Sequence, residues 1–405
     1  MKVSPMLDNI RTIPIVSSVD LDADVHAAFA RYRPSFPFVR LDTGGYIVLR
    51  HDDVARLMND SRLQATDIAM PVQAGVTEGV LFDIFAHGML TANGDVHARR
   101  RSPLSRALAN QVLDQFRQHV RKAAAALIDA SMQTGRLELA SDYAAKLPIL
   151  ALASLLEVPA TDIADFARNI YAMNAFFRPD PTDEAVADAE TAAQWVQNYL
   201  DGLLTQAERD RSRGFLAQYL EFTEEGKLAR SEVLVQIIQL IIGGTESVRT
   251  ALVAQTVQML SNPEQWRAVC SDPTLVPNAV AEGMRFEPGI AGVVRVSVQD
   301  IELDGWTLPA GQLVLLSFVS ALRDEHIFDR PDIFDLSRPN LKLARLAFGG
   351  GAHKCVAEAM GLAELEEGLS VLADRLPGLE LETRPRFQGH MFVRKTSACW
   401  VRWDR

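Results

Sequence analysis

Cysteine is scarce in this sequence, with three residues, Cys270, Cys355 and Cys399, in a chain of 405. They are too few and too widely spaced for a disulfide framework, which excludes the class of small disulfide-stapled secreted proteins. Free thiols persist in reducing compartments, so we predict that the protein is cytoplasmic.

Long apolar runs and an excess of positive charge are also missing. No uninterrupted apolar run reaches the roughly 18 residues of a membrane span, and residues 1–20 hold no apolar signal segment. We therefore expect a soluble protein without a membrane partner. The net charge of −11 argues against nucleic acid as a partner, because phosphate binding needs a positive field.

Hydropathy patterns predict a helix-rich chain with small sheets. Hydrophobic residues make up 48% of the sequence, which is enough for a large buried core. The expected elements are a helix over 25–32, strands over 38–41 and 46–49, a helix over 52–59, a loop over 66–95, helical periodicity over 97–260, and β-like runs over 293–298, 301–303 and 313–318.

Cys355 ends a glycine-rich loop and directly precedes a helix-forming run over 356–369. A helix N-terminus favours negative charge, so we expect a lowered thiol pKa and a thiolate able to bind a metal. The glycines let the backbone approach something flat and bulky. The alternative is a small buried cysteine beside an ordinary turn, which is how most free cysteines behave.

The context of this cysteine matches a specific pattern. Phe-Gly-x-Gly-x-His-x-Cys, carried by Phe348, Gly349, Gly351, His353 and Cys355, resembles the haem-thiolate signature of the cytochrome P-450 family. The resemblance implies one haem domain over 1–405 without a fused reductase, folded as a triangular helical prism around a buried haem b. Cys355 would be the axial ligand to the iron. Where the family usually has glycine, this chain has Ala357.

A long apolar helix is predicted from about Ser231, a candidate N-cap, to Ser261. Four residues that share one of its faces form a polar strip: Gln239, Gly243, Glu246 and Ser247. A buried carboxylate needs a partner, a proton or a water-filled cavity. A satisfied structural network is the alternative to a functional strip.

The run Gly-Gly-Thr-Glu-Ser over 243–247 resembles the oxygen-activation motif of the same family. This implies that Glu246 gates protons and that Ser247 orients oxygen. At the position of Ser247 the family most often has threonine. Serine keeps the hydroxyl but lacks the methyl group that restricts χ1, so we expect looser positioning and some leakage of reduced oxygen as peroxide.

Charged pairs at helical spacing supply the groups expected to hold the cofactor. Glu282 and Arg285 resemble the Glu-x-x-Arg element of the family, which implies a buried ion network, although such a pair alone is usually a surface feature. Because Ile333 occupies the position that usually supplies a third arginine, Arg338 is the substitute candidate.

The haem propionates call for cationic groups at one edge. His97 and Arg101 resemble the propionate pair of the family, and Arg295 and His353 complete the implied set. A basic patch is expected from Arg99, Arg100, Lys354 and Arg106. Such a patch would attract an acidic ferredoxin, which the resemblance implies as electron donor together with a nicotinamide-dependent reductase. A solvated basic face is the alternative for Arg99 and Arg100.

The resemblance implies an enzyme that inserts one atom of O2 into a small hydrophobic substrate, by hydroxylation or oxidative demethylation. Candidates to line its pocket are Gln239, Ile242, Gly243, Ile290, Val294 and Phe392. Gln239 is the candidate to hydrogen-bond a substrate, whereas Phe176 and Phe177 are more often core. The alternative functions are a peroxide-driven peroxygenase, disfavoured by Glu246 and Ser247, and a non-catalytic haem-thiolate sensor.

Overall fold

The computed structural model describes residues 12–177, 181–210 and 214–404. Its helices are α1 (Ser18–Ala23), α2 (Val25–Tyr32), α3 (His51–Leu57), α4 (Ala69–Gln73), α5 (Val80–Ala86), α6 (Gly94–Ala109), α7 (Leu113–Asp129), α8 (Lys146–Leu155), α9 (Ile163–Asn174), α10 (Asp183–Asp210), α11 (Phe215–Glu225), α12 (Arg230–Ser261), α13 (Pro263–Ser271), α14 (Val276–Phe286), α15 (Phe318–Ala321) and α16 (Glu358–Arg375). A π-helix, η1 (Leu139–Ala144), and the 3-10 helices η2 (Ala175–Phe177), η3 (Pro273–Leu275), η4 (Leu341–Phe348) and η5 (Gly351–His353) complete the helical elements.

The strands are short. They are β1 (Ile15–Val16), β2 (Phe38–Leu41), β3 (Tyr46–Val48), β4 (Leu63–Gln64), β5 (Arg136–Glu138), β6 (Gly292–Ser297), β7 (Ile301–Leu303), β8 (Trp306–Leu308), β9 (Leu313–Ser317), β10 (Glu380–Leu381), β11 (Phe387–Gln388), β12 (Lys395–Thr396) and β13 (Trp400–Arg402). The predicted mainly helical class with small sheets is thus confirmed.

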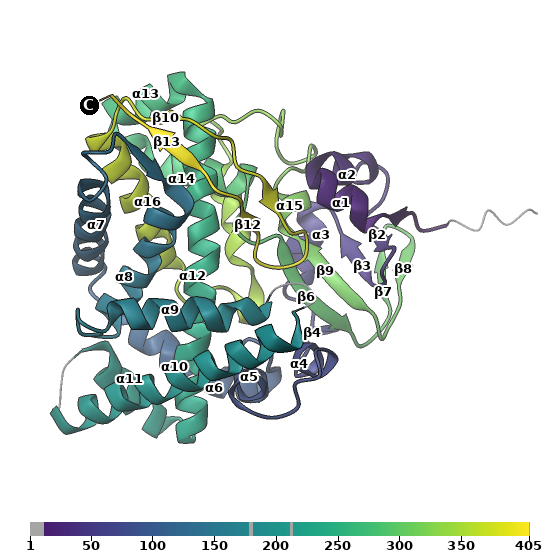
Figure 1. The fold of residues 1–405 in the computed structure, drawn as a ribbon. Helices are drawn as coiled ribbons and strands as arrows, with labels where there is room; N and C mark the ends of the chain where they lie inside the picture. The colour runs from purple at the N-terminus through teal and green to yellow at the C-terminus, as the bar shows by residue number, and fades with distance from the viewer. Residues whose placement is uncertain (1–11, 178–180, 211–213, 405) are drawn as a thin grey trace, which may run out of the picture.

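One mixed sheet joins N-terminal strands to two strands between residues 292 and 317, in the order β1-β2-β3-β9-β6-β4. The predicted hairpin is present as antiparallel β2 and β3, and its turn contains Gly44 and Gly45 at φ of 110° and 81°, where glycine is favoured. Figure 1 shows this sheet with α1 and α2 on one side of the molecule and most helices on the other.

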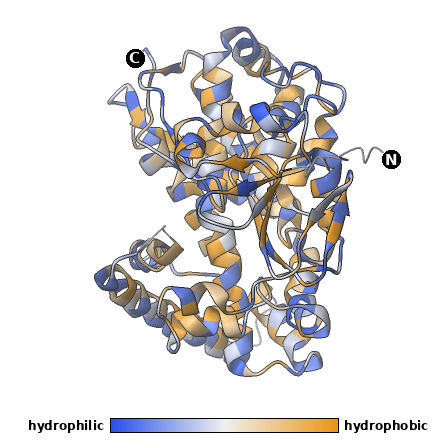
Figure 2. Ribbon diagram, turned by 90° about the vertical axis from the view of Figure 1, so that its right-hand side faces the viewer, coloured by the Kyte–Doolittle hydropathy of each residue, from blue (hydrophilic) through white to orange (hydrophobic). Residues whose placement is uncertain are grey.

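Helix α12 runs through the middle of the helical part (Figure 1) and packs against α8, α14 and α16. Among the described helices it is long and apolar enough to cross a bilayer, but 67% of its most apolar window is buried inside the protein. Packing against neighbouring helices therefore accounts for its composition. Most other helices carry both hydrophobic and hydrophilic residues along their length, as expected of helices that bury one face (Figure 2).

Three local predictions need correction. Residues 66–95 are not simply a loop, because they contain α4 and α5, and α5 buries Val80, Leu81, Ile84 and Phe85. Helix α12 begins at Arg230 rather than after a Ser231 cap, and the Glu232 carboxylate accepts the Ala229 N–H at 3.1 Å. The helix after the cysteine begins at Glu358 rather than at residue 356.

Candidate active site

The Cys355 loop is a tight structure held between α3 and α16. The Cys355 N–H donates to the Phe348 carbonyl at 2.8 Å, which closes the loop. Gly351 has a φ of +61°, and a Cβ at this position would lie 2.3 Å from the Met58 carbonyl oxygen at the end of α3. Only glycine fits there, both for backbone conformation and for space. The loop therefore presents the cysteine in one fixed place.

The expectation of a lowered Cys355 pKa is wrong for the free thiol. The residue is exposed on one side, yet enough protein surrounds its sulfur that desolvation raises the thiol pKa. The N–H of Ala357 and the charge of Arg101 lower the pKa, but by less. Since α16 starts at Glu358, a single backbone N–H reaches the sulfur. A bound metal ion deprotonates a coordinating thiol outright, so this pKa does not oppose ligation.

Four of the predicted cofactor-binding residues meet beside this loop. The rings of His97 on α6 and His353 on η5 lie 4.1 Å apart between centroids. Burial lowers the pKa of His353 to about 3, helped by the charges of Arg295 and Arg101. Burial also lowers the pKa of His97, again with both arginine charges contributing. The two imidazoles are therefore neutral and the two guanidiniums charged.

This cluster fits a ligand with two carboxylates. Neither Arg101 nor Arg295 has an acidic partner among the residues that the structure describes, although burial lowers the pKa of both. The Nε2 atom of His97 is buried and has no hydrogen-bond partner there. Two desolvated cations and an unsatisfied imidazole nitrogen make a site for anions. The two propionates of a haem match this charge.

Three residues of the polar strip on α12, Gly243, Glu246 and Ser247, are at least partly exposed, whereas most of the helix is buried. Gly243 is exposed, and a Cβ there would meet no atom within 4 Å. The hydroxyl of Ser247 donates to the Gly243 carbonyl at 2.6 Å, while Glu246 pairs with Arg249 at 3.3 Å. Arg249 is itself held by the Ala140 carbonyl in η1. The acid and the hydroxyl thus lie side by side, each with a partner within its own helix.

Gln239, the remaining residue of this strip, does not have the substrate-binding role that was predicted for it. Its side chain is 3% exposed. Its amide nitrogen donates to the Ile84 carbonyl at 2.7 Å, and its amide oxygen accepts the Leu90 N–H at 3.0 Å. Both polar atoms are already bonded to backbone, so Gln239 ties the α5 region to α12 and offers no free group to a substrate.

The other pocket candidates are apolar and partly exposed. Ile242 and Gly243 lie on α12, and Val294 lies on β6 beside Arg295. Ile290 forms a β-bridge with Val393, which places it next to Phe392, whose exposed fraction is 49%. Phe176 is core, as expected, and packs with Phe177 and Phe85 through ring contacts.

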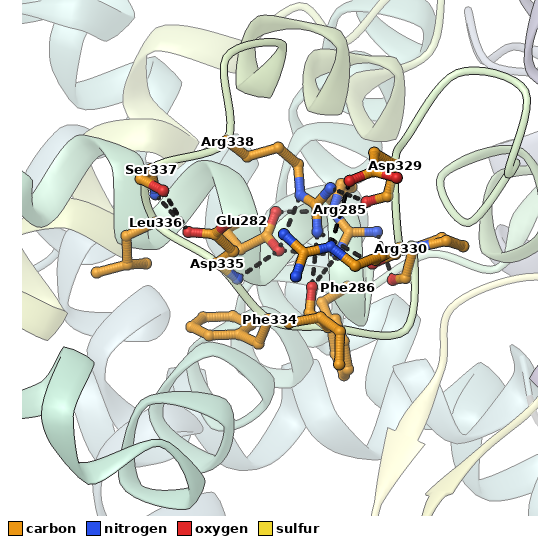
Figure 3. Close-up of polar contacts among 12 residues, drawn as sticks. Glu282, Arg285, Phe286, Asp329, Arg330, Phe334, Asp335, Leu336, Ser337 and Arg338 are labelled. Carbon is orange, nitrogen blue, oxygen red and sulfur yellow. Dashed lines mark hydrogen bonds and ion pairs between the residues drawn. The ribbon is translucent and has the colours of Figure 1, made fainter.

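Glu282 and Arg285 form a fully buried ion pair, with N–O distances of 2.7 and 2.8 Å (Figure 3). Arg338 joins this pair at 3.4 Å, in the position considered for a third arginine. The two arginines also donate to backbone carbonyls of the irregular segment that follows α15. These acceptors are the carbonyl oxygens of Leu322, Asp329, Arg330, Pro331 and Ile333. The network fixes the segment leading to the Cys355 loop.

The predicted basic patch is not formed as proposed. Arg100 is buried, and both it and Arg99 pair with Glu232 on α12. Arg106 pairs with Glu225, and Lys354 pairs with Glu358. Arg99, Arg100 and Arg106 are each paired with an acid from a distant part of the chain, and Lys354 is paired with the first residue of α16. The sequence pattern alone could not reveal partners brought in by the fold.

Sequence reasoning also missed a second buried ion cluster. Glu287 caps the C-terminal end of α14 and contacts His26 on α2 and Arg394 after β11. No spacing rule connects three residues so far apart in the chain. The sequence shows a glutamate two residues after the Glu-x-x-Arg element, but its burial, which is what demands a partner, is visible only in the structure.

Comparison with known proteins agrees with this arrangement. A model of the family "Cytochrome P450" matches residues 161–375, more than half of the chain. A plant-inducible cytochrome P450, pinF1, of Rhizobium radiobacter is 34% identical over 94% of this chain and 91% of its own. Nocardicin C N-oxygenase of Nocardia uniformis is 31% identical over 93% of each chain.

Solved structures give the same result. Epothilone B-bound cytochrome P450epoK superposes with a TM-score of 0.85 at 25% identity, covering 95% of this chain and 98% of that one. A myxobacterial cytochrome P450, CYP267B1, in complex with myristic acid gives a TM-score of 0.84 at 27% identity over the same shares. From the family match and these relatives, the chain belongs to the cytochrome P450 family of haem-thiolate monooxygenases.

Proposed function

We propose that this P450 monooxygenase inserts one atom of O2 into a small hydrophobic organic substrate, by hydroxylation or oxidative demethylation. The main support is that Glu246 and Ser247 are adjacent on a partly exposed stretch in the middle of a mostly buried helix. Family membership assigns the haem-thiolate cofactor, O2, an organic substrate and a redox partner. The names of two relatives, an N-oxygenase and a C-19 steroid 1alpha-hydroxylase from Sorangium cellulosum, both describe oxygen transfer.

Five residues at the Cys355 loop would hold the cofactor. Cys355 binds the iron, and His97, Arg101, Arg295 and His353 hold the propionates. When bound, the haem supplies the activation of O2 by iron and thiolate. Desolvation around the two arginines strengthens their attraction for carboxylates, because fewer water molecules screen the charges.

The α12 residues handle protons and orientation. Glu246 carries protons to the oxygen side of the site, and its carboxylate rests against Arg249 between transfers. The Ser247 hydroxyl, which donates to the Gly243 carbonyl in this structure, would orient oxygen by donating a hydrogen bond to it instead. Both groups are partly exposed, so a proton can reach them without breaking the core.

Substrate class follows from the apolar character of the pocket candidates. Ile242, Ile290, Val294 and Phe392 offer hydrocarbon surface, and the Gln239 amide is occupied by backbone bonds. A hydrophobic substrate therefore binds by burial rather than by a network of hydrogen bonds. Electrons come from a ferredoxin with its nicotinamide-dependent reductase, in the cytoplasm.

The test uses purified holoprotein. The reduced, carbon monoxide-bound spectrum should show the shifted band of thiolate ligation, and Cys355→Ser should abolish it. Substrates are then found by spectral titration of a hydrophobic compound library, followed by turnover with ferredoxin, reductase and nicotinamide. Product formed with hydrogen peroxide alone, at the same rate as with the electron donors, would favour a peroxygenase. A thiolate spectrum without any turnover would favour a sensor.

A further inference from the structure

A buried ion cluster lies at the end of α14, outside the groups assigned to the cofactor. The Arg394 guanidinium pairs with the Glu287 carboxylate, and the exposed fraction of Arg394 is 2%. The Nε2 atom of His26 lies 3.2 Å from both oxygens of that carboxylate. Burial and the charges of Arg323 and Arg394 hold the pKa of His26 well below its usual value. A neutral His26 thus donates one hydrogen bond to a carboxylate that Arg394 neutralises.

The backbone of Arg394 connects this cluster to two other segments. Its N–H donates to the Gly289 carbonyl at 2.9 Å, and its carbonyl accepts the Thr250 hydroxyl of α12 at 2.6 Å. On the same side the Ala291 N–H donates to the Phe392 carbonyl at 2.7 Å. The second half of the turn between β11 and β12, residues 392–394, is therefore bonded to residues 289–291.

Residues 289–291 in turn lie directly on the polar stretch of α12. A Cβ at Gly289 would stand 2.4 Å from the Ser247 carbonyl oxygen and 3.3 Å from the Ala251 Cβ, so this contact requires glycine. Three segments thus form one hydrogen-bonded unit that carries Ser247, Ile290 and Phe392. Arg394 is the residue that contacts the other two segments and also the Glu287 charge.

We propose that Arg394, held by Glu287, is a positioning residue that sets Phe392 and Ile290 relative to Ser247 and thereby determines which ligands fit. This inference rests on the proposed function of Ser247 and the apolar pocket. Phe392 is half exposed, so core packing does not fix it and its backbone bonds must. A buried, ion-paired arginine fixes a turn more narrowly than loose surface contacts do, because less conformational freedom remains.

The test compares two iron ligands of different size. Imidazole probes access to the haem iron, whereas 4-phenylimidazole also carries a ring into the substrate side. Spectral titration of holoprotein should show that Arg394→Gln weakens 4-phenylimidazole binding about tenfold and changes imidazole binding less than about twofold. Arg386→Gln, an exposed arginine beside the same hairpin, is the matched control and should change neither.

A second variant covers the case in which Arg394→Gln fails to fold with Glu287 left unpaired. The double variant Glu287→Leu with Arg394→Met removes both charges, so it should stay folded and still lose affinity for 4-phenylimidazole alone. Hydrogen exchange of the segment 389–394 should be about tenfold faster in both variants.

Equal shifts for the two ligands, or no shift for either, would overturn the inference while leaving the P450 function intact. A wild-type protein that binds imidazole without a spectral change would overturn the proposed haem site, and the inference with it.

Discussion

Two buried glutamates at the end of α14 anchor different kinds of ion cluster. Glu282 lies between Arg285 and Arg338, whose remaining donors reach backbone carbonyls of residues 322–333. Glu287 lies between His26 and Arg394, and among the described residues the Arg394 side chain bonds no carbonyl. The first cluster holds an irregular chain segment together, whereas the second only fixes a turn. The two should respond differently when their charges are removed.

The largest effect is expected from apolar replacement of the first pair. Glu282→Leu with Arg285→Met should destabilise the protein by about 3–5 kcal/mol, because several buried carbonyls lose their donors at about 1–3 kcal/mol each. The same exchange at Glu287 and Arg394 should cost less, about 1–3 kcal/mol, since it orphans the buried His26 N–H but no carbonyl. Denaturant unfolding of both double variants measures the contrast. Equal losses would show that the carbonyl bonds do not distinguish the clusters.

Glu232 is a third acid paired with arginines, and its lowered pKa links stability to pH. Glu232 pairs with Arg99 and Arg100, and its side chain is 11% exposed. These bonds lower the Glu232 pKa from its ordinary 4.5 to about 2, and Tyr219 is the titratable neighbour on α11. Because the folded-state pKa is depressed, the stabilisation is complete above pH 4.5 and is lost as the pH falls toward 2.

Removing the Glu232 carboxylate should therefore make the free energy of unfolding less dependent on pH between about pH 4.5 and pH 2. Glu232→Gln should cost roughly 2–3 kcal/mol at pH 7 and almost nothing at pH 2, measured by denaturant unfolding across pH. Glu264→Gln, an exposed glutamate on α13, is the control with no expected change. A loss that stayed constant from pH 7 to pH 2 would contradict the assignment of the lowered pKa to Glu232.

A smaller effect is expected where a neutral side chain makes the long-range bonds. Gln239→Leu orphans the Leu90 N–H and the Ile84 carbonyl, so it should destabilise the protein by about 1–3 kcal/mol and loosen the α5 region. Thermal unfolding and hydrogen exchange over 84–90 measure this. Weaker substrate binding with unchanged stability would instead restore Gln239 as a substrate ligand.

The sequence was sufficient for local features and insufficient for partners brought together by folding. Helix 25–32, the hairpin over 38–49 and the Glu282–Arg285 pair follow from spacing, because neighbours in the chain are neighbours in space. The partners of Glu287 and Arg99 come from distant segments. Motif resemblance grouped His97, Arg101, Arg295 and His353, which periodicity alone would not have done.

The pKa of Cys355 shows the same limit on a smaller scale. A helix start two residues later than expected leaves one N–H near the sulfur, and the surrounding protein raises the thiol pKa instead of lowering it. Sequence indicates that a helix follows the cysteine, but element boundaries are uncertain by a few residues. Here those residues decide how many backbone N–H groups of the helix N-terminus lie near the Cys355 sulfur.

The smallest effect on stability is expected for Ser247→Thr on α12, which should instead change how efficiently electrons are used to form product. Ser247→Thr adds one methyl group at a partly exposed position, so the free energy of unfolding should change by less than about 0.5 kcal/mol. The methyl restricts χ1 and holds the hydroxyl in one direction. Product formed per nicotinamide consumed should rise about twofold, with less peroxide released. An unchanged ratio would mean that the hydrogen bond to the Gly243 carbonyl already fixes the serine, and that the hydroxyl rather than its methyl sets coupling in this enzyme.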